Sequence, residues 1–87
     1  MITATPGARV RLLRKLTRKD ATDDVAMRFT RRTGGWKLRL DHARSADTAI
    51  THEGRLVLLL DEQVSQAMAD MTLDVAGTEA GPRLTLC

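Results

Sequence analysis

Residues 25–40 of the chain read VAMRFTRRTGGWKLRL, and this stretch determines which fold the sequence predicts. Apolar and polar side chains alternate on each side of the glycine pair, and a period of two is typical of half-buried strands. Two alternating runs joined by glycines indicate a β-hairpin. The sequence therefore predicts a strand over Val25–Thr30, a turn at Thr33-Gly34-Gly35 and a returning strand over Trp36–Leu40.

Short strands and one short helix are predicted after the hairpin. Thr48–His52 and Arg55–Leu60 are expected to be strands around a tight turn at Glu53-Gly54. The second of them is almost wholly apolar, which indicates burial on both faces. Asp61 is a suitable N-cap for a helix that follows. The remaining predicted features are the helical apolar positions Val64, Ala67, Met68 and Met71, strands at Leu73–Val75 and Leu84–Leu86, and loops over His42–Asp47 and Gly77–Gly81.

An amphipathic helix is predicted before the hairpin. Thr5 offers an N-cap hydroxyl, and Pro6 suits the first helical position because its missing N–H costs nothing there. The apolar side of this helix is formed by Val10, Leu12, Leu13 and Leu16. The element order is therefore helix, four strands, helix, two strands, which indicates an α+β class. At 87 residues, we expect residues 1–87 to form a single domain.

Composition excludes several classes of function. Cys87 is the only cysteine, so the sequence supplies neither an internal disulfide nor a cysteine-rich zinc site. The first residues lack the pattern of a signal peptide, and the apolar run Leu56–Leu60 is too short to cross a bilayer. We therefore expect a cytoplasmic protein with no membrane partner. Because no nucleophile–base–acid spacing, phosphate loop or HExxH motif occurs, we expect no enzymatic activity.

Three local patterns resemble the HesB-like, or A-type, iron–sulfur carrier domain, over about residues 8–87. They are Val25–Phe29 running into Thr33-Gly34-Gly35, Glu53-Gly54-Arg55 running into Leu56–Asp61, and Met71-Thr72-Leu73-Asp74-Val75. The resemblance implies an N-terminal helix followed by a compact, mostly antiparallel β-sandwich or barrel-like core with one short inserted helix.

The resemblance does not extend to the cluster ligands of that family. Its carriers hold iron or a cluster with three cysteines, one directly after the glycines of the first hairpin and two in a Cys-Gly-Cys tail. Here Gly34-Gly35 is followed by Trp36, and the sequence reaches Cys87 without such a tail. Because several thiolates must converge on the irons, we expect a scaffold without a cluster site and without a cofactor in a single chain.

Several candidate sites remain open in the sequence. Cys87 is the candidate metal ligand, and it would need further ligands from other chains of an oligomer to hold iron or an iron–sulfur cluster. His42 and His52 each adjoin an acid, but neighbouring residues in a strand point to opposite faces. We therefore interpret both histidines as surface loop residues. Met27, Met68 and Met71 are interpreted as core residues.

Charge is divided unequally along the chain. Residues 1–40 carry eleven Lys or Arg against three Asp, a net charge of +8, whereas residues 41–87 carry three Arg against eight acids, a net charge of −5. Cations that lie off the apolar faces form a candidate basic patch for a partner. The patch residues are Arg11, Arg14, Lys15, Arg18, Lys19, Arg28, Lys37 and Arg39. We do not expect sequence-specific recognition of RNA, which relies on aromatic side chains that stack on bases. Phe29 and Trp36 are the only large aromatic residues, and we expect Trp36 to be buried.

The sequence thus leaves three functions open. The first is a non-enzymatic interaction or assembly subunit, linked to iron–sulfur or metal trafficking, that binds another protein or a second copy of itself. The second is residual iron or iron–sulfur binding through Cys87 across an oligomer. The third is nucleic-acid or ribosome association through the basic N-terminal half, which would weaken steeply with salt.

Overall fold

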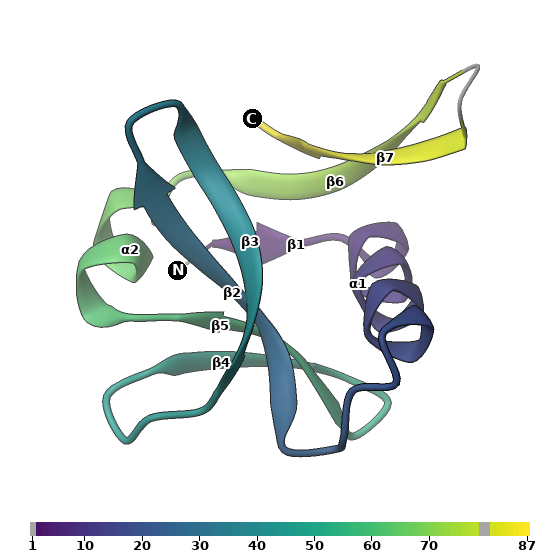
Figure 1. Cartoon of the computed structure of the whole chain (residues 1–87). Coiled ribbons are helices and arrows are strands. Elements are labelled where there is room, and N and C mark those ends of the chain that lie inside the picture. Colours follow the sequence, from purple (N-terminus) through teal and green to yellow (C-terminus); the bar gives the residue numbers. More distant parts are fainter. Residues whose placement is uncertain (1, 79–80) are drawn as a thin grey trace.

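The structure is a computed structural model that describes residues 2–78 and 81–87. Two mixed sheets and two helices make up this part of the chain (Figure 1). One sheet has the strand order β1-β6-β7 and the other β3-β2-β5-β4, which confirms the predicted α+β class. The elements are β1 (Thr3–Ala4), α1 (Pro6–Arg18), β2 (Val25–Arg32), β3 (Gly35–His42), β4 (Thr48–His52), β5 (Arg55–Leu60), α2 (Glu62–Ala67), β6 (Thr72–Thr78) and β7 (Gly81–Leu86).

Three antiparallel hairpins supply most of the strand pairing. They are β2–β3, β4–β5 and β6–β7. The first two are joined by turns at Thr33-Gly34 and Glu53-Gly54, and Gly35 of the predicted first turn already belongs to β3. Glu53 and Gly54 both have positive φ, as a tight hairpin turn requires. The sheets also contain two parallel pairings, β2 with β5 and β1 with β6. Strand β1 was not predicted, because a strand of two residues has no detectable period.

Several predicted boundaries differ from the structure. Helix α2 ends at Ala67, before the predicted helical positions Met68 and Met71, and the last two strands are longer than predicted. Strand β2 ends two residues later than predicted, at Arg32, and β3 begins one residue earlier and ends two residues later, at Gly35 and His42. The predicted loop over Gly77–Gly81 is shorter, since Gly77 lies in β6 and Gly81 in β7. Residues 79 and 80 of that loop lie outside the described residues.

The start of α1 is tied to β6 through the predicted cap. The Thr5 hydroxyl accepts a hydrogen bond from the Ala8 N–H at 3.2 Å and donates one to Asp74 at 2.8 Å. Asp74 is the acid in the third pattern of the sequence, and this contact gives it a structural role. The buried side of α1 consists of Ala8, Leu12 and Leu16. Val10, which was predicted to share that side, is exposed.

The core lies between the two sheets and is covered at one end by α1 (Figure 1). Val57–Leu60 of β5 are fully buried, which confirms the prediction that this strand is enclosed on both faces. Met27 and Met68 are core residues as predicted, and Met71 packs against the core half-buried. Leu40 departs from its predicted inward position and is exposed. Neither α1 nor α2 has the length and apolar character that crossing a membrane would require.

Candidate functional site

A groove of about 390 Å³ lies between the β2–β3 hairpin and the β6–β7 hairpin. We call it the hairpin groove. Strands β3 and β7 are each the last strand of their sheet, so the groove lies between two sheet edges (Figure 1). Its lining is mostly apolar. The lining residues are Phe29, Trp36, Lys37, Leu38, Leu73, Leu84, Thr85 and Leu86.

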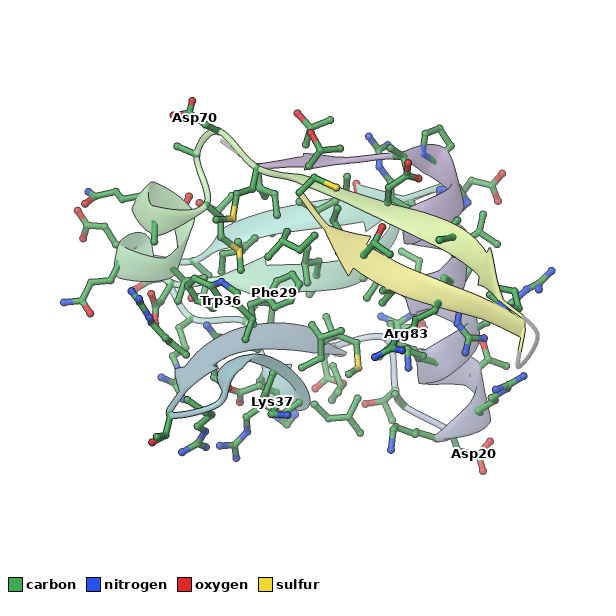
Figure 2. All side chains as sticks on the ribbon, turned by 90° about the horizontal axis from the view of Figure 1, so that it is seen from above. Asp20, Phe29, Trp36, Lys37, Asp70 and Arg83 are labelled. Atoms are coloured by element: carbon green, nitrogen blue, oxygen red, sulfur yellow. The ribbon has the colours of Figure 1, made fainter. Side chains whose placement is uncertain are left out.

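Trp36 occupies the position directly after the glycine turn and forms part of the groove wall. Its ring meets Phe29 edge to face, with 6.4 Å between the ring centroids, and the two lie side by side in Figure 2. The Arg31 guanidinium lies 5.5 Å from the Trp36 ring centroid, a cation–π contact. Trp36 was expected to be buried, but it is half-buried because one side of the indole faces the groove.

Cys87 directly follows the groove residue Leu86. Its backbone is fixed by two hydrogen bonds, since the Cys87 N–H donates to the Thr72 carbonyl and the Thr72 N–H donates to the Cys87 carbonyl, each at 3.0 Å. The thiol is free and exposed. The fold therefore brings the first hairpin turn and the end of the last strand to the same groove, from residues more than fifty positions apart in the sequence.

The groove residues do not fit an iron–sulfur cluster held by one chain. Within residues 2–78 and 81–87, no three His, Cys, Asp or Glu side chains are grouped closely enough to hold a metal ion. Carbon atoms of Trp36, Leu38 and Leu86 line the region, and Cys87 is the only thiol in the sequence. A cluster needs several soft ligands around its irons, and the described lining of the hairpin groove includes no thiol or imidazole.

The hairpin groove continues into a second depression of about 240 Å³, which we call the cationic end. Leu38 and Leu84 line both depressions. The cationic end adds Arg11 and Lys15 from α1 and Arg83 from β7, together with Pro82. Figure 2 shows Arg83 beside α1. The wall that faces the solvent therefore changes from apolar to positive along one continuous surface.

The cations of this end are unpaired within the described part of the chain. The ion pairs there involve Arg28, Arg44, Arg55 and His42, not Arg11, Lys15 or Arg83. The Nε atom of Arg11 is buried and has no hydrogen-bond partner among residues 2–78 and 81–87. A buried polar atom without a partner is costly, and like charges four residues apart on a helix, such as Arg11 and Lys15, repel each other. The cationic end is therefore a surface that an anion would stabilise.

Arg28 does not belong to a surface patch, and its inclusion in the predicted basic patch was wrong. Its residue is only 4% exposed. The guanidinium pairs with Asp41 at 2.8 Å and with both carboxylate oxygens of Asp47, and it also donates to the His42 carbonyl. These contacts raise the pKa of Arg28, chiefly through the hydrogen bonds to Asp47. Arg28 thus holds the segment between β3 and β4 in place through its bonds to His42 and Asp47. The alternation of residues in β2 could not reveal this role.

Both acids of this network have lowered pKa values. The Arg28 hydrogen bond is the main cause for Asp47, whose side chain is 3% exposed. For Asp41 the main cause is the hydrogen bond donated by the His42 N–H, with Arg28 adding to it. Each carboxylate is therefore stabilised in its charged form by the native structure.

The other predicted patch residues are distributed over several surfaces. Arg14, Arg18 and Lys19 are exposed along α1, and Arg39 is exposed on β3. Lys37 lines the hairpin groove, whereas only Arg11 and Lys15 reach the cationic end. Sequence reasoning missed Arg83, because its place beside α1 depends on how β6–β7 folds back. The available signal was that Arg83 is the only Lys or Arg after Arg55 in the acidic half of the chain.

The two histidines lie at the ends of strands β3 and β4, and not in loops as predicted. His42 lies 3.4 Å from Asp24, and both side chains are 69% exposed, which confirms His42 as a surface residue. The pKa of Asp24 is lowered, mainly by a hydrogen bond from the Thr22 hydroxyl. His52 lies at the end of β4, half-buried. Neither residue approaches the hairpin groove or the cationic end.

Comparisons with known proteins give a structural match but no sequence match. No family model and no curated protein matches the sequence. SufA of Escherichia coli, involved in biosynthesis of iron–sulfur clusters, matches with a TM-score of 0.77 at 17% identity, over 99% of this chain and 83% of SufA. IscA with its [2Fe-2S] cluster matches with a TM-score of 0.63 at 14% identity, over 100% of this chain and 84% of IscA.

A solution structure of a protein from Aquifex aeolicus gives the same result. Its TM-score is 0.63 at 15% identity, over 99% of this chain and 89% of that protein. Likenesses at such low identity concern the arrangement of the backbone and not the site. The chain therefore has the HesB-like, A-type fold that its sequence patterns resembled, and it carries this fold with a single cysteine.

Proposed function

We propose that this protein is a non-enzymatic interaction or assembly subunit, linked to iron–sulfur or metal trafficking, that holds no cluster within one chain. The observation that carries the proposal is Trp36. The residue after the glycine turn is the first cysteine in the carriers that this sequence resembles, and here it is an indole that packs on Phe29. The fold supports the link to iron–sulfur proteins, and the ligand shortage supports a binding role in place of a carrier role.

Further features agree with a binding role. The groove beside Trp36 is open and lined largely by carbon, which suits contact with another molecule better than the coordination of iron. A single free thiol is compatible with the reducing cytoplasm, where we place the protein. The described residues that line the groove include no Asp, Glu, His, Ser or Cys side chain. They therefore offer no combination of nucleophile, base and acid that would support an enzymatic role.

A second candidate function is iron binding between chains through Cys87. It is favoured by one observation: the Cys87 backbone is held by two hydrogen bonds to Thr72, so the exposed thiol sits at a defined place. Two or more chains that meet at this strand end would bring their thiols together.

One experiment separates the two candidates. The protein and its Cys87→Ser variant are purified anaerobically, incubated with ferrous iron and sulfide, desalted, and analysed for iron, absorption and native mass. The proposal expects neither protein to keep stoichiometric iron or a visible charge-transfer band. A cluster held by an oligomer of the original chain and lost in Cys87→Ser would establish the second candidate. Iron retained stoichiometrically by monomeric Cys87→Ser would refute both.

A further inference from the structure

The outer edge of β7 has main-chain groups without partners. Cys87 and Thr72 exchange two hydrogen bonds, so they form a hydrogen-bonded pair of the β6–β7 ladder. Such pairs alternate along an antiparallel ladder. Leu86 and Leu84 therefore direct their N–H and C=O groups away from β6. Because β7 is the last strand of its sheet, no strand of the described chain pairs with them.

This open edge lies along the hairpin groove. Leu84, Thr85 and Leu86 form one wall, and Trp36 and Leu38 of β3 form the opposite wall. Leu84 and Leu86 are only half-buried although they pack against the core. Proteins commonly protect long apolar edges with charges, bulges or a cover, and Leu84-Thr85-Leu86 carries no charge. An extended peptide can pair with such an edge and place alternate side chains in the neighbouring groove.

The charges around the groove define the chemistry of that peptide. Arg11, Lys15 and Arg83 form the cationic end, and Lys37 lines the apolar part. Within residues 2–78 and 81–87, no acidic residue lines either depression. A basic peptide would be repelled by these cations, whereas acidic side chains would be attracted to them. The depression of about 240 Å³ has the volume of roughly eight water molecules, enough for a carboxylate side chain.

We propose that the hairpin groove binds an extended segment of a partner protein that pairs with the β7 edge, places apolar side chains against Trp36 and Leu86, and places acidic side chains in the cationic end. This inference rests on the proposed function, whose partner class it names. The main-chain bonds to Leu84 and Leu86 supply sequence-independent binding, and the apolar groove with its cationic end supplies selection.

The test is a peptide selection on metal-free Cys87→Ser protein. A random peptide library is displayed, bound and sequenced, and selected peptides are synthesised for fluorescence anisotropy. Recovered sequences are expected to alternate apolar residues and to carry acids toward one end. Two versions of each peptide are then compared, one N-methylated at the odd-numbered residues and one at the even-numbered residues. One version should lose binding and the other should keep it, because only every second peptide N–H group faces β7. Equal binding by both methylated peptides would exclude strand addition.

Matched charge reversals test the cationic end. The variant Lys15→Glu with Arg83→Glu should weaken binding by roughly tenfold or more, because two acidic side chains then face an acidic peptide. The control Arg18→Glu with Lys19→Glu changes the net charge equally on exposed positions that line neither depression, and it should bind nearly as the parent does. Equal losses in both variants would overturn the proposed acidic recognition.

Other occupants give distinct results in the same experiments. Recovery of basic peptides, or of none, would overturn the inference, and so would a dimer whose β7 edges pair with each other in the free protein. Binding of RNA that responds equally to the two charge-reversed variants would point to a general basic surface. If the selection fails, the hairpin groove is not a peptide site. The proposed function is then still tested separately by the iron content of the purified protein, because the peptide experiments use metal-free Cys87→Ser protein.

Discussion

Two groups of cations differ sharply in their partners, although the sequence presents both as parts of one basic half. Arg28 is buried and bonded to Asp41, Asp47 and a backbone carbonyl. Arg11 and Arg83 line an open depression without an ion pair in the described chain. The first group holds the fold together and the second is available to a ligand. Whether a positive residue has ion-pair partners within the fold therefore says more about its function than the number of positive residues does.

The largest effect is expected from breaking the satisfied network. Arg28→Met should lower the free energy of unfolding by about 3–5 kcal/mol, because the buried Asp47 carboxylate loses its counter-charge. Urea denaturation measures this change. The matched control is Arg39→Met, which lies opposite Arg28 in the β2–β3 ladder but is exposed, and its effect should stay within about 0.5 kcal/mol. Similar losses in the two variants would contradict the assignment of Arg28.

The same network predicts how stability depends on pH. Asp47 and Asp41 have native pKa values below the ordinary value of 3.8, so their charged forms stabilise the folded state above that pH. This stability should be lost as the pH falls below about 4, because protons then bind preferentially to the unfolded chain. Urea unfolding at a series of pH values measures the slope. Asp47→Asn should flatten it, and an unchanged slope in that variant would count against the network.

A smaller effect is expected at the start of α1. Thr5→Ala removes the hydroxyl that caps Ala8 and bonds Asp74, and it should cost about 1 kcal/mol in unfolding free energy. Thr17→Ala is a suitable control, since its hydroxyl only bonds the carbonyl of Leu13 within the exposed face of the same helix. If both substitutions cost the same, the link between α1 and β6 through Asp74 adds no stability.

The smallest effect should come from the unsatisfied group. Arg11→Met removes a guanidinium whose buried Nε has no partner, and it keeps most of the apolar stem. The free energy of unfolding should stay the same or rise by up to about 1 kcal/mol. Arg28→Met is expected to be strongly destabilising. The difference in unfolding free energy between the two variants therefore compares an arginine without a partner with one that has several. A clear loss of stability in Arg11→Met would reveal a native partner for this side chain.

The sequence predicted the elements well wherever a local period or a turn controls the chain. The glycine pair indicated the first hairpin, and the apolar run of β5 indicated burial on both faces, and the structure confirms both predictions. The Thr5 cap was also predicted, although its second bond to Asp74 was not. Parallel pairings such as β2 with β5 join segments that are distant in sequence, and no local pattern encodes them.

The candidate site was less predictable, because it depends on which hairpins lie side by side. Trp36 was noted as the residue that follows the glycine pair without a cysteine and was expected to be buried, and its part in a groove wall required the position of β7. Arg83 was missed for the same reason. Arg28 was misassigned because alternation places it on the face opposite Met27 and Phe29, whereas the segment 43–47 folds over that face and covers it.

Amide hydrogen exchange of the free protein tests the central structural claim, that β7 presents an unpaired edge beside the hairpin groove. The amides of Leu84 and Leu86 should exchange much faster than those of Thr85 and Cys87, which bond to β6. Protection of Leu84 and Leu86 equal to that of Thr85 and Cys87 would show that the edge is already covered, and it would contradict the account.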